Sequence, residues 1–298
     1  MRGLSDGSGV DLQLIRRIHQ LGELTKAACS MFGAWDKALP GGKGLMQMRA
    51  LDWSVDGPFI DWPQVTVYHP SNPNENAFAN VGFPGWIGLI TGMNDKKMGI
   101  SEIGASYSGE VAFPGESRHG YPFTWMLRDM LQFNSTGDAA LETMQNADRT
   151  CNLILGVGDG KPESQVFHGV SSDAELLTVY TDTYLMPKVN DDGVDMTHED
   201  IENVVYWGMD WFCPPFHKQL HDRIVANWGA ITAENTMRDI IPRTNTGNMH
   251  IAVYDYNHWD MYVAFARQSK YRWVSRKNDN LESLKCVLNF VRLFVCWS

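Results

Sequence analysis

Cys29 is the cysteine of this chain with the clearest candidate chemistry. It stands in "KAACS", and Arg49 and Asp52 follow in "MRALDW", beyond a glycine-rich loop. A thiol is nucleophilic as its thiolate, and charged residues within an otherwise apolar run need partners when they are buried. The pattern therefore favours a reactive cysteine near a buried charged pair. The alternative is that Cys29 is a small core residue, which is common for a free cysteine.

A self-contained helix is predicted ahead of Cys29. Apolar residues recur at helical spacing behind a Ser/Gly/Asp start, at Val10, Leu14, Ile18 and Leu21. This periodicity predicts an amphipathic helix over residues 10–27 that ends just before the cysteine. We therefore expect residues 1–28 to be a releasable, propeptide-like leader and residues 29–298 to be a single domain.

The cysteine and the charged pair fall on two predicted strands. "CSMFGAW" and "GLMQMRALDW" have strand composition, and the Pro and Gly residues of "DKALPGGKG" between them suit a turn. Arg49 and Asp52 are three positions apart, so they face opposite sides of an ideal strand unless the chain bends. We expect both side chains to be buried and within reach of Cys29.

Strand and helix patterns alternate along the rest of the chain without repeats. Strands are predicted at 85–91, 98–105, 149–159, 164–170 and 175–182, and as a pair within 248–266. Helices are predicted at 122–133, 135–147, 216–229 and 232–243, with Ser135 or Thr136 and then Thr232 as N-caps. Strands in blocks around a helix pair favour an α+β layered fold over a parallel βαβ array.

Composition excludes several classes of protein. The net charge of −10 and the absence of Lys/Arg clusters argue against a nucleic-acid partner. No run is long enough to cross a bilayer, and "MRGLSDGSG" has no apolar region typical of a secretory signal. Five scattered cysteines do not form a disulfide framework or a zinc motif. His217 and His221 share a helix face without a third ligand nearby, so we expect neither a metal nor a cofactor.

Four segments together resemble a known family. "CSMFGAW", "MRALDW", "GLITGMNDKKMGISE" and "ADRTCNLILGVGD" are similar to the N-terminal nucleophile amidohydrolases of the acid ceramidase type, also called the acyl-coenzyme A:isopenicillin N acyltransferase-like family. The resemblance covers about residues 10–267 and is greatest to the acid ceramidase-like proteins of social amoebae. It implies a four-layer α/β/β/α sandwich made as a precursor that cleaves itself before Cys29. The tail beyond Arg267 departs from the family pattern.

The implied cleavage explains why the cysteine needs a leader. An unperturbed thiol has a pKa of about 8.5, and an α-amine at about 7.7–8.0 becomes available as its base only once the Ala28–Cys29 bond is broken. The resemblance assigns Asp52 to holding the new amine or ammonium group. It assigns Arg49 to orienting the substrate carbonyl and lowering the thiol pKa, and Glu102 to a carboxylate near the cleavage site.

The resemblance also implies an oxyanion hole built from an asparagine side chain. The corresponding segment here, "VVYWGMDW", contains no asparagine. Asn152, directly after Cys151, is the alternative donor.

The implied activity is hydrolysis of a fatty-acyl amide, such as ceramide or an N-acylethanolamine, through a thioester on Cys29. Two alternatives stay open: a non-catalytic relative that binds a lipid or a partner, and an acyltransferase that uses the same nucleophile. The expected partner is a small lipid amide, reached at a membrane surface without a transmembrane segment. The resemblance implies a secreted or lysosomal protein, and the sequon at Asn134 fits that route.

Overall fold

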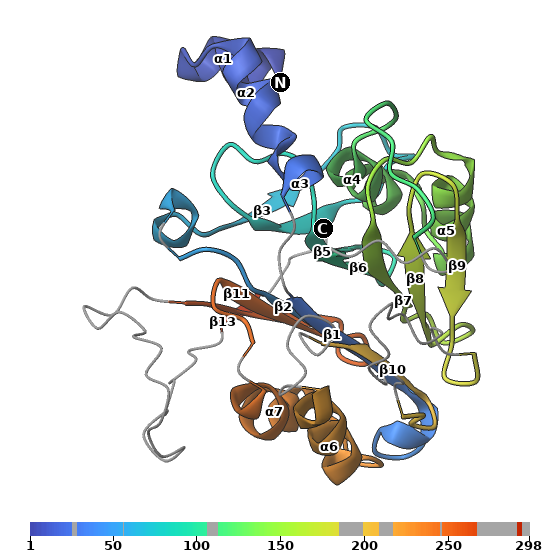
Figure 1. The fold of residues 1–298 in the computed structure, drawn as a ribbon. Helices are drawn as coiled ribbons and strands as arrows, with labels where there is room; N and C mark the ends of the chain where they lie inside the picture. Colours follow the sequence, from blue (N-terminus) through green and yellow to red (C-terminus); the bar gives the residue numbers. More distant parts are fainter. Residues whose placement is uncertain are drawn as a thin grey trace.

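The computed structural model describes residues 1–25, 29–55, 57–105, 113–184, 199–208, 217–244, 246–266 and 291–293. Two antiparallel β-sheets lie face to face at its centre (Figure 1). In spatial order, the first sheet contains β10 (Val204–Trp207), β1 (Cys29–Trp35), β2 (Leu45–Leu51), β11 (His250–Asp255), β12 (Asp260–Phe265) and β13 (Val291–Leu293). The second contains β3 (Gln64–Tyr68), β4 (Phe78–Gly82), β5 (Thr91–Asn94), β6 (Met98–Gly104), β7 (Leu153–Asp159), β8 (Val166–Ser172) and β9 (Leu177–Tyr180).

Helices cover the outer face of each sheet (Figure 1). The helices α4 (Phe123–Phe133) and α5 (Gly137–Asn146) pack on the second sheet, and α6 (His217–Asn227) and α7 (Ala233–Asn235) pack on the first. The helix after α7 continues through a π-helical turn at Thr236–Ile240 and a 3₁₀ turn at Ile241–Arg243. The structure is therefore an α+β layered fold, as the sequence pattern predicts, and the four-layer α/β/β/α sandwich that the family resemblance implies.

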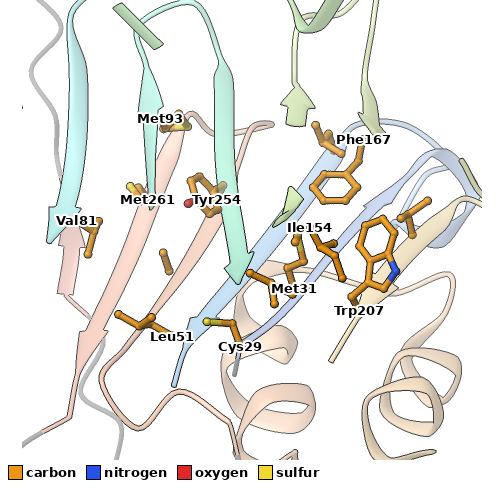
Figure 2. Close-up of a cluster of buried hydrophobic side chains, with 14 of the residues drawn as sticks. Cys29, Met31, Leu51, Val81, Met93, Ile154, Phe167, Trp207, Tyr254 and Met261 are labelled. Carbon is orange, nitrogen blue, oxygen red and sulfur yellow. The ribbon is translucent and has the colours of Figure 1, made fainter. Parts of the chain in front are cut away.

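Neighbouring side chains along a strand divide between two cores. On β1, Cys29 and Met31 face the second sheet, whereas Phe32 and Ala34 face the helices. The central core between the sheets includes Met31, Ile154, Phe167 and Tyr254, and Cys29 lies at its edge (Figure 2). Alternation along a strand thus places the thiol between the sheets.

Several element boundaries differ from the expectations. Of the predicted strand 85–91, only Thr91 is in a strand, because β5 runs through the polar segment that the sequence indicates as a turn. The strands β3, β4, β10 and β13 were not predicted, although polar and apolar residues alternate along Gln64–Tyr68. In the tail, Val291–Leu293 pairs with β12 as an edge strand. The helix caps Thr136 and Thr232 are confirmed, and each hydroxyl accepts a backbone N–H bond.

The leader is not the single helix over 10–27 that the sequence predicts. It forms three short helices, α1 (Arg2–Ser8), α2 (Leu12–His19) and α3 (Leu21–Leu24), and residues 26–27 lie outside the described residues. Asp11 caps α2 by accepting hydrogen bonds from two backbone N–H groups. Each helix is short, and no helix of the described segments is long and apolar enough to cross a bilayer.

His19 holds the leader against α4 and the segment between β4 and β5. Its ring lies between the indoles of Trp86 and Trp125, with ring centroids 5.2 and 5.4 Å away. Its Nε2 accepts a hydrogen bond from the backbone N–H of Ile87 at 3.0 Å, and its Nδ1 donates to the carbonyl of Ile15 at 2.8 Å. Burial lowers the pKa of His19, which favours the neutral ring that this bonding pattern requires.

Candidate active site

Cys29 is the first residue of β1 and is completely buried. It pairs with Leu51 of β2, and Leu51 pairs with His250 of β11, so these residues form one row across the first sheet. Arg49 lies two residues before Leu51 on the same face. Strand alternation therefore places the Arg49 side chain between those of Cys29 and His250.

Arg49 is a buried cation whose donors are directed at three residues. Its Nη2 lies 3.5 Å from the sulfur of Cys29. Its Nε and Nη2 donate to the backbone carbonyl of Glu102 at 3.2 and 3.0 Å, and Nη2 lies 3.4 Å from the Glu102 carboxylate. Its Nη1 lies 3.2 Å from Nε2 of His250. The guanidinium therefore joins the two sheets at the cysteine.

Burial changes the pKa of the Cys29 thiol more than the charge of Arg49 does. Loss of solvent raises the pKa of Cys29 to about 12, although the charge of Arg49 and the backbone N–H of Asp52 both act to lower it. The carboxylates of Glu102 and Asp52 raise it further. The expected lowering by Arg49 is therefore present but outweighed, and the thiol of the uncleaved chain stays protonated at neutral pH.

Asp52 follows the end of β2, and its carboxylate is fixed by a loop before β11. Its Oδ1 accepts hydrogen bonds from the backbone N–H groups of Gly247 and Asn248 at 2.8 and 3.0 Å, and its Oδ2 accepts from the hydroxyl of Thr246. Burial raises the pKa of Asp52, and these bonds act against that rise. Since β2 ends at Leu51, the chain can turn there, and Arg49 and Asp52 are both buried near Cys29 as expected.

An apolar pocket opens beside this cluster. Glu102 lines it together with Leu51, the residue that pairs with Cys29. The remaining lining residues come from the leader, from segments next to strands of both sheets and from the start of α4: Leu21, Gly22, Thr25, Trp53, Phe59, Phe83, Trp86, Ile90, Phe123 and Met249. The pocket is thus mostly aromatic and aliphatic, with the Glu102 carboxylate as the one charged group in its lining.

Asn152 is buried directly before β7. Its backbone carbonyl accepts a hydrogen bond from the backbone N–H of Ala105, which directly follows the neighbouring strand β6 and lies three residues beyond Glu102. Three residues of extended chain span roughly 10 Å, so Asn152 lies at the same end of the second sheet as Glu102 but further along. Its role as an oxyanion donor remains a prediction. In "VVYWGMDW", the segment that corresponds to the family's oxyanion asparagine, Trp207 and Gly208 are described, and residues 209–211 lie outside the described residues.

Sequence reasoning missed His250 and the loop that holds Asp52. His250 opens β11 after a polar segment, "TNTGN", and no local pattern separates it from an ordinary strand residue. The loop could have been found, because a cluster of Thr, Asn and Gly directly before a strand can supply donors to a neighbouring carboxylate. Among the described residues, no group of three His, Cys, Asp or Glu side chains could hold a metal ion.

Comparison with solved structures decides the fold family. An N-acylethanolamine-hydrolyzing acid amidase ortholog from Caenorhabditis elegans matches with a TM-score of 0.54 at 13% identity, over 76% of this chain and 93% of that one. A penicillin V acylase from Agrobacterium tumefaciens matches with a TM-score of 0.50 at 10% identity, over 80% and 83%. The chain has the fold of the N-terminal nucleophile hydrolases. The resemblance seen in the sequence is confirmed at this level.

Two curated proteins of Dictyostelium discoideum are similar to this chain in sequence. Protein dcd1A is 34% identical over 278 residues, and protein dcd1B is 33% identical over 265 residues. These matches cover 90% and 89% of this chain but only 60% and 50% of the two relatives. The expected similarity to proteins of social amoebae is confirmed, and no family model matches the chain.

Proposed function

We propose that this chain is a self-processing cysteine amidohydrolase that cleaves a fatty-acyl amide through a thioester on Cys29. One observation carries the proposal: the thiol at the first position of β1 lies 3.5 Å from the buried Arg49 guanidinium, beside an apolar pocket. The N-terminal nucleophile fold supports the assignment, because in that fold the nucleophile opens a central strand.

Self-processing requires attack by the thiol on its own preceding peptide. The Cys29 sulfur adds to the carbonyl carbon of Ala28, which lies outside the described residues, and the C–N bond breaks as the nitrogen takes up the thiol proton. The products are a thioester at Ala28 and a free α-amine on Cys29. Water then hydrolyses the thioester, releasing the Ala28 carboxylate and returning the thiol. The newly formed amine is the base that the buried thiol lacks in the precursor.

Turnover of substrate repeats the same chemistry on an acyl amide. The α-amine takes the thiol proton, the sulfur attacks the acyl carbon, and the proton passes to the leaving amine. Water then hydrolyses the acyl thioester. Asp52, held by three donors, can stabilise the charged form of the α-amine, and Arg49 can stabilise the thiolate.

The pocket supports a substrate with a long apolar acyl chain. Its walls are almost entirely aliphatic and aromatic, which suits burial of methylene groups. We propose ceramide-like or N-acylethanolamine-like amides as the substrate class, the second because the structurally similar nematode protein is an N-acylethanolamine-hydrolyzing acid amidase. From the family resemblance we expect a secreted or lysosomal enzyme.

Exposed apolar residues of the leader support the proposal that the protein reaches its lipid substrate at a membrane surface. Its apolar residues Val10, Leu14, Ile18 and Leu24 are exposed by 39, 48, 41 and 68%. They flank the pocket-lining residues of α3, so a bilayer contacted by this face would lie near the pocket entrance. Sedimentation with phospholipid vesicles should recover the wild type, and Leu14→Glu should stay in the supernatant. Gln13→Glu, which adds the same charge next to it, should sediment like the wild type.

The central test is product release together with an acyl–enzyme adduct. Purified protein is incubated with an N-acylethanolamine and with a ceramide, and fatty acid release is followed alongside intact mass. The wild type should release fatty acid and carry the acyl mass on the fragment that begins at Cys29, and Cys29→Ser should not turn over. Transfer of the acyl group to an added amine in preference to water would identify an acyltransferase instead. Release by the Cys29→Ala variant would exclude the cysteine mechanism.

One observation favours the non-catalytic alternative. "VVYWGMDW" lacks the asparagine that the family resemblance implies for the oxyanion hole. If Asn152 supplies the donor instead, Asn152→Ala should lower turnover by about 10²–10³ and leave self-cleavage largely intact. A wild type that binds the lipid amide without hydrolysing it would favour the binding protein.

A further inference from the structure

His250 has no part in the chemistry described above, yet it is completely buried against the catalytic arginine. Its Nε2 lies 3.2 Å from Nη1 of Arg49 and 3.1 Å from the hydroxyl oxygen of Thr91. Arg49 reaches it from β2, and Thr91 reaches it from β5 of the opposite sheet. The histidine therefore lies at the junction of the two sheets, in the row that begins at Cys29.

The chemistry of Arg49 decides which form of the ring is present. A guanidinium has only donors, so Nε2 must offer a lone pair to it. The proton of the neutral ring is then on Nδ1, which is buried and has no hydrogen-bond partner among the described residues. The reverse tautomer would place two N–H groups against each other, and a protonated ring would place two cations in contact without solvent.

We propose that His250 is a positioning residue, which holds the Arg49 guanidinium through an Nε2 lone pair so that Nη2 is directed at the Cys29 sulfur. Without this acceptor, Nη1 would have no partner at this position, and the guanidinium could rotate away from the thiol. Glu102 fixes the opposite side of the guanidinium through its carbonyl and carboxylate oxygens. The two contacts together set the plane of the cation.

The surroundings hold His250 in its neutral form. The Arg49 cation from β2 is in direct contact with the ring, and Cys29 from β1 and Glu102 from β6 contact the same guanidinium. Burial, and then the charge of Arg49, lower the pKa of His250 well below its ordinary value. The ring is thus a fixed acceptor across the physiological pH range.

A nitrogen NMR measurement tests the tautomer without relying on any enzymatic activity. The full-length Cys29→Ala chain is labelled with ¹⁵N, and long-range proton–nitrogen correlations of the imidazoles are recorded from about pH 5 to about pH 8. The His250 signals, assigned by their loss in His250→Gln, should show one neutral tautomer with the proton on Nδ1 and no titration. A proton on Nε2, or titration within this range, would overturn the proposal. The proposed amidase activity can fail without affecting this result.

Two substitutions then test positioning in the active chain, a step that rests on the proposed function. His250→Gln keeps an acceptor oxygen, and His250→Leu removes it. The glutamine variant should retain cleavage within about threefold of wild type, whereas the leucine variant should slow it by about 10²-fold, the scale of losing one preorganised donor. Thr91→Val, which leaves the Arg49 contact in place, is the matched control and should cleave like the wild type. Equal loss in both folded His250 variants would contradict positioning. If neither variant folds, the tautomer measurement decides, with the His250 signals assigned through backbone correlations in the Cys29→Ala chain.

Discussion

The Nη2 nitrogen of Arg49 lies 3.5 Å from the sulfur of Cys29, and both side chains are fully buried. The relationship follows from the register of β1 with β2, which pairs Cys29 with Leu51 and so brings residue 49 to the diagonal position on the same face. A cation fixed beside a dry thiol favours the thiolate only after a base becomes available. The α-amine released by cleavage would be that base.

Removing the cation should destabilise the fold as well as stop cleavage. Arg49→Met leaves the Glu102 carboxylate buried without its ion pair, which should lower the free energy of unfolding by about 3–5 kcal/mol. Denaturant titration measures this change. Adding Glu102→Gln in the same chain should restore part of the loss, since it removes the negative charge that pairs with Arg49 in the wild type. An unchanged free energy in Arg49→Met would show that the pair contributes nothing to stability.

Asp52→Asn should impair turnover more than it impairs folding. The substitution preserves size but places an amide near the N–H groups of Gly247 and Asn248 and removes the negative charge. Turnover should fall by about 10²–10⁴, the range for loss of a group that assists proton transfer. The check is kcat on an acyl amide beside the thermal midpoint of unfolding. Gly247→Ala makes a useful comparison, because Gly247 has a φ of 88° and a Cβ there would lie 2.3 Å from Ile251. Gly247→Ala should displace the backbone N–H group that donates to the Asp52 carboxylate, and so it should also lower kcat.

Attachment of the leader should weaken as the solution becomes acidic. The pKa of His19 is lower in the docked state than in a free chain, so docking by the neutral ring is fully present above about pH 6.5 and is lost as the pH falls below it. Protonation converts the Nε2 acceptor into a donor facing the N–H of Ile87. The protection factor of the Ile87 amide, measured by hydrogen exchange in the Cys29→Ala chain and corrected for the intrinsic exchange rate at each pH, should fall in acid.

The control variants isolate His19 as the cause. His19→Phe keeps a ring between Trp86 and Trp125 but should abolish the acid-dependent part of the exchange. His119→Phe, at an exposed histidine, should leave it unchanged. Equal acid sensitivity in all three chains would assign the effect to another group.

Enlarging the pocket should change the preference for acyl chains. Ile90 lines the pocket without contributing to the charged cluster, and Ile90→Ala removes packing against an acyl chain. Each lost methylene contact is worth roughly 10–200-fold in discrimination, so KM for the favoured long-chain amide should rise while kcat on a short-chain amide is retained. Phe133→Ala, at a residue that is 53% exposed outside the pocket, should alter neither value.

Local sequence information was enough for part of the site. Cys29, Arg49 and Asp52 lie on one hairpin, so strand patterns and the turn between them already bring the three together. His250 could not be predicted this way, because it is 201 residues from Arg49 in sequence and meets it only through the pairing of β2 with β11.

For the leader, the local sequence predicts the secondary structure but not the face that is buried. Its helical periodicity correctly indicates helix, but the apolar residues of that pattern are largely exposed and the polar His19 is buried. Two tryptophans far along the chain, Trp86 and Trp125, create a stacking site that no local pattern in the leader reveals. The docked face was therefore set by tertiary contacts rather than by amphipathicity.

Intact mass spectrometry of the purified protein tests the central claim most directly. The wild type should separate under denaturing conditions into residues 1–28 and a fragment beginning at Cys29, and Cys29→Ala should remain one chain. Denaturation is needed because His19 keeps the leader docked. A wild type that hydrolyses acyl amides while its mass remains that of the uncleaved chain would contradict the N-terminal nucleophile mechanism.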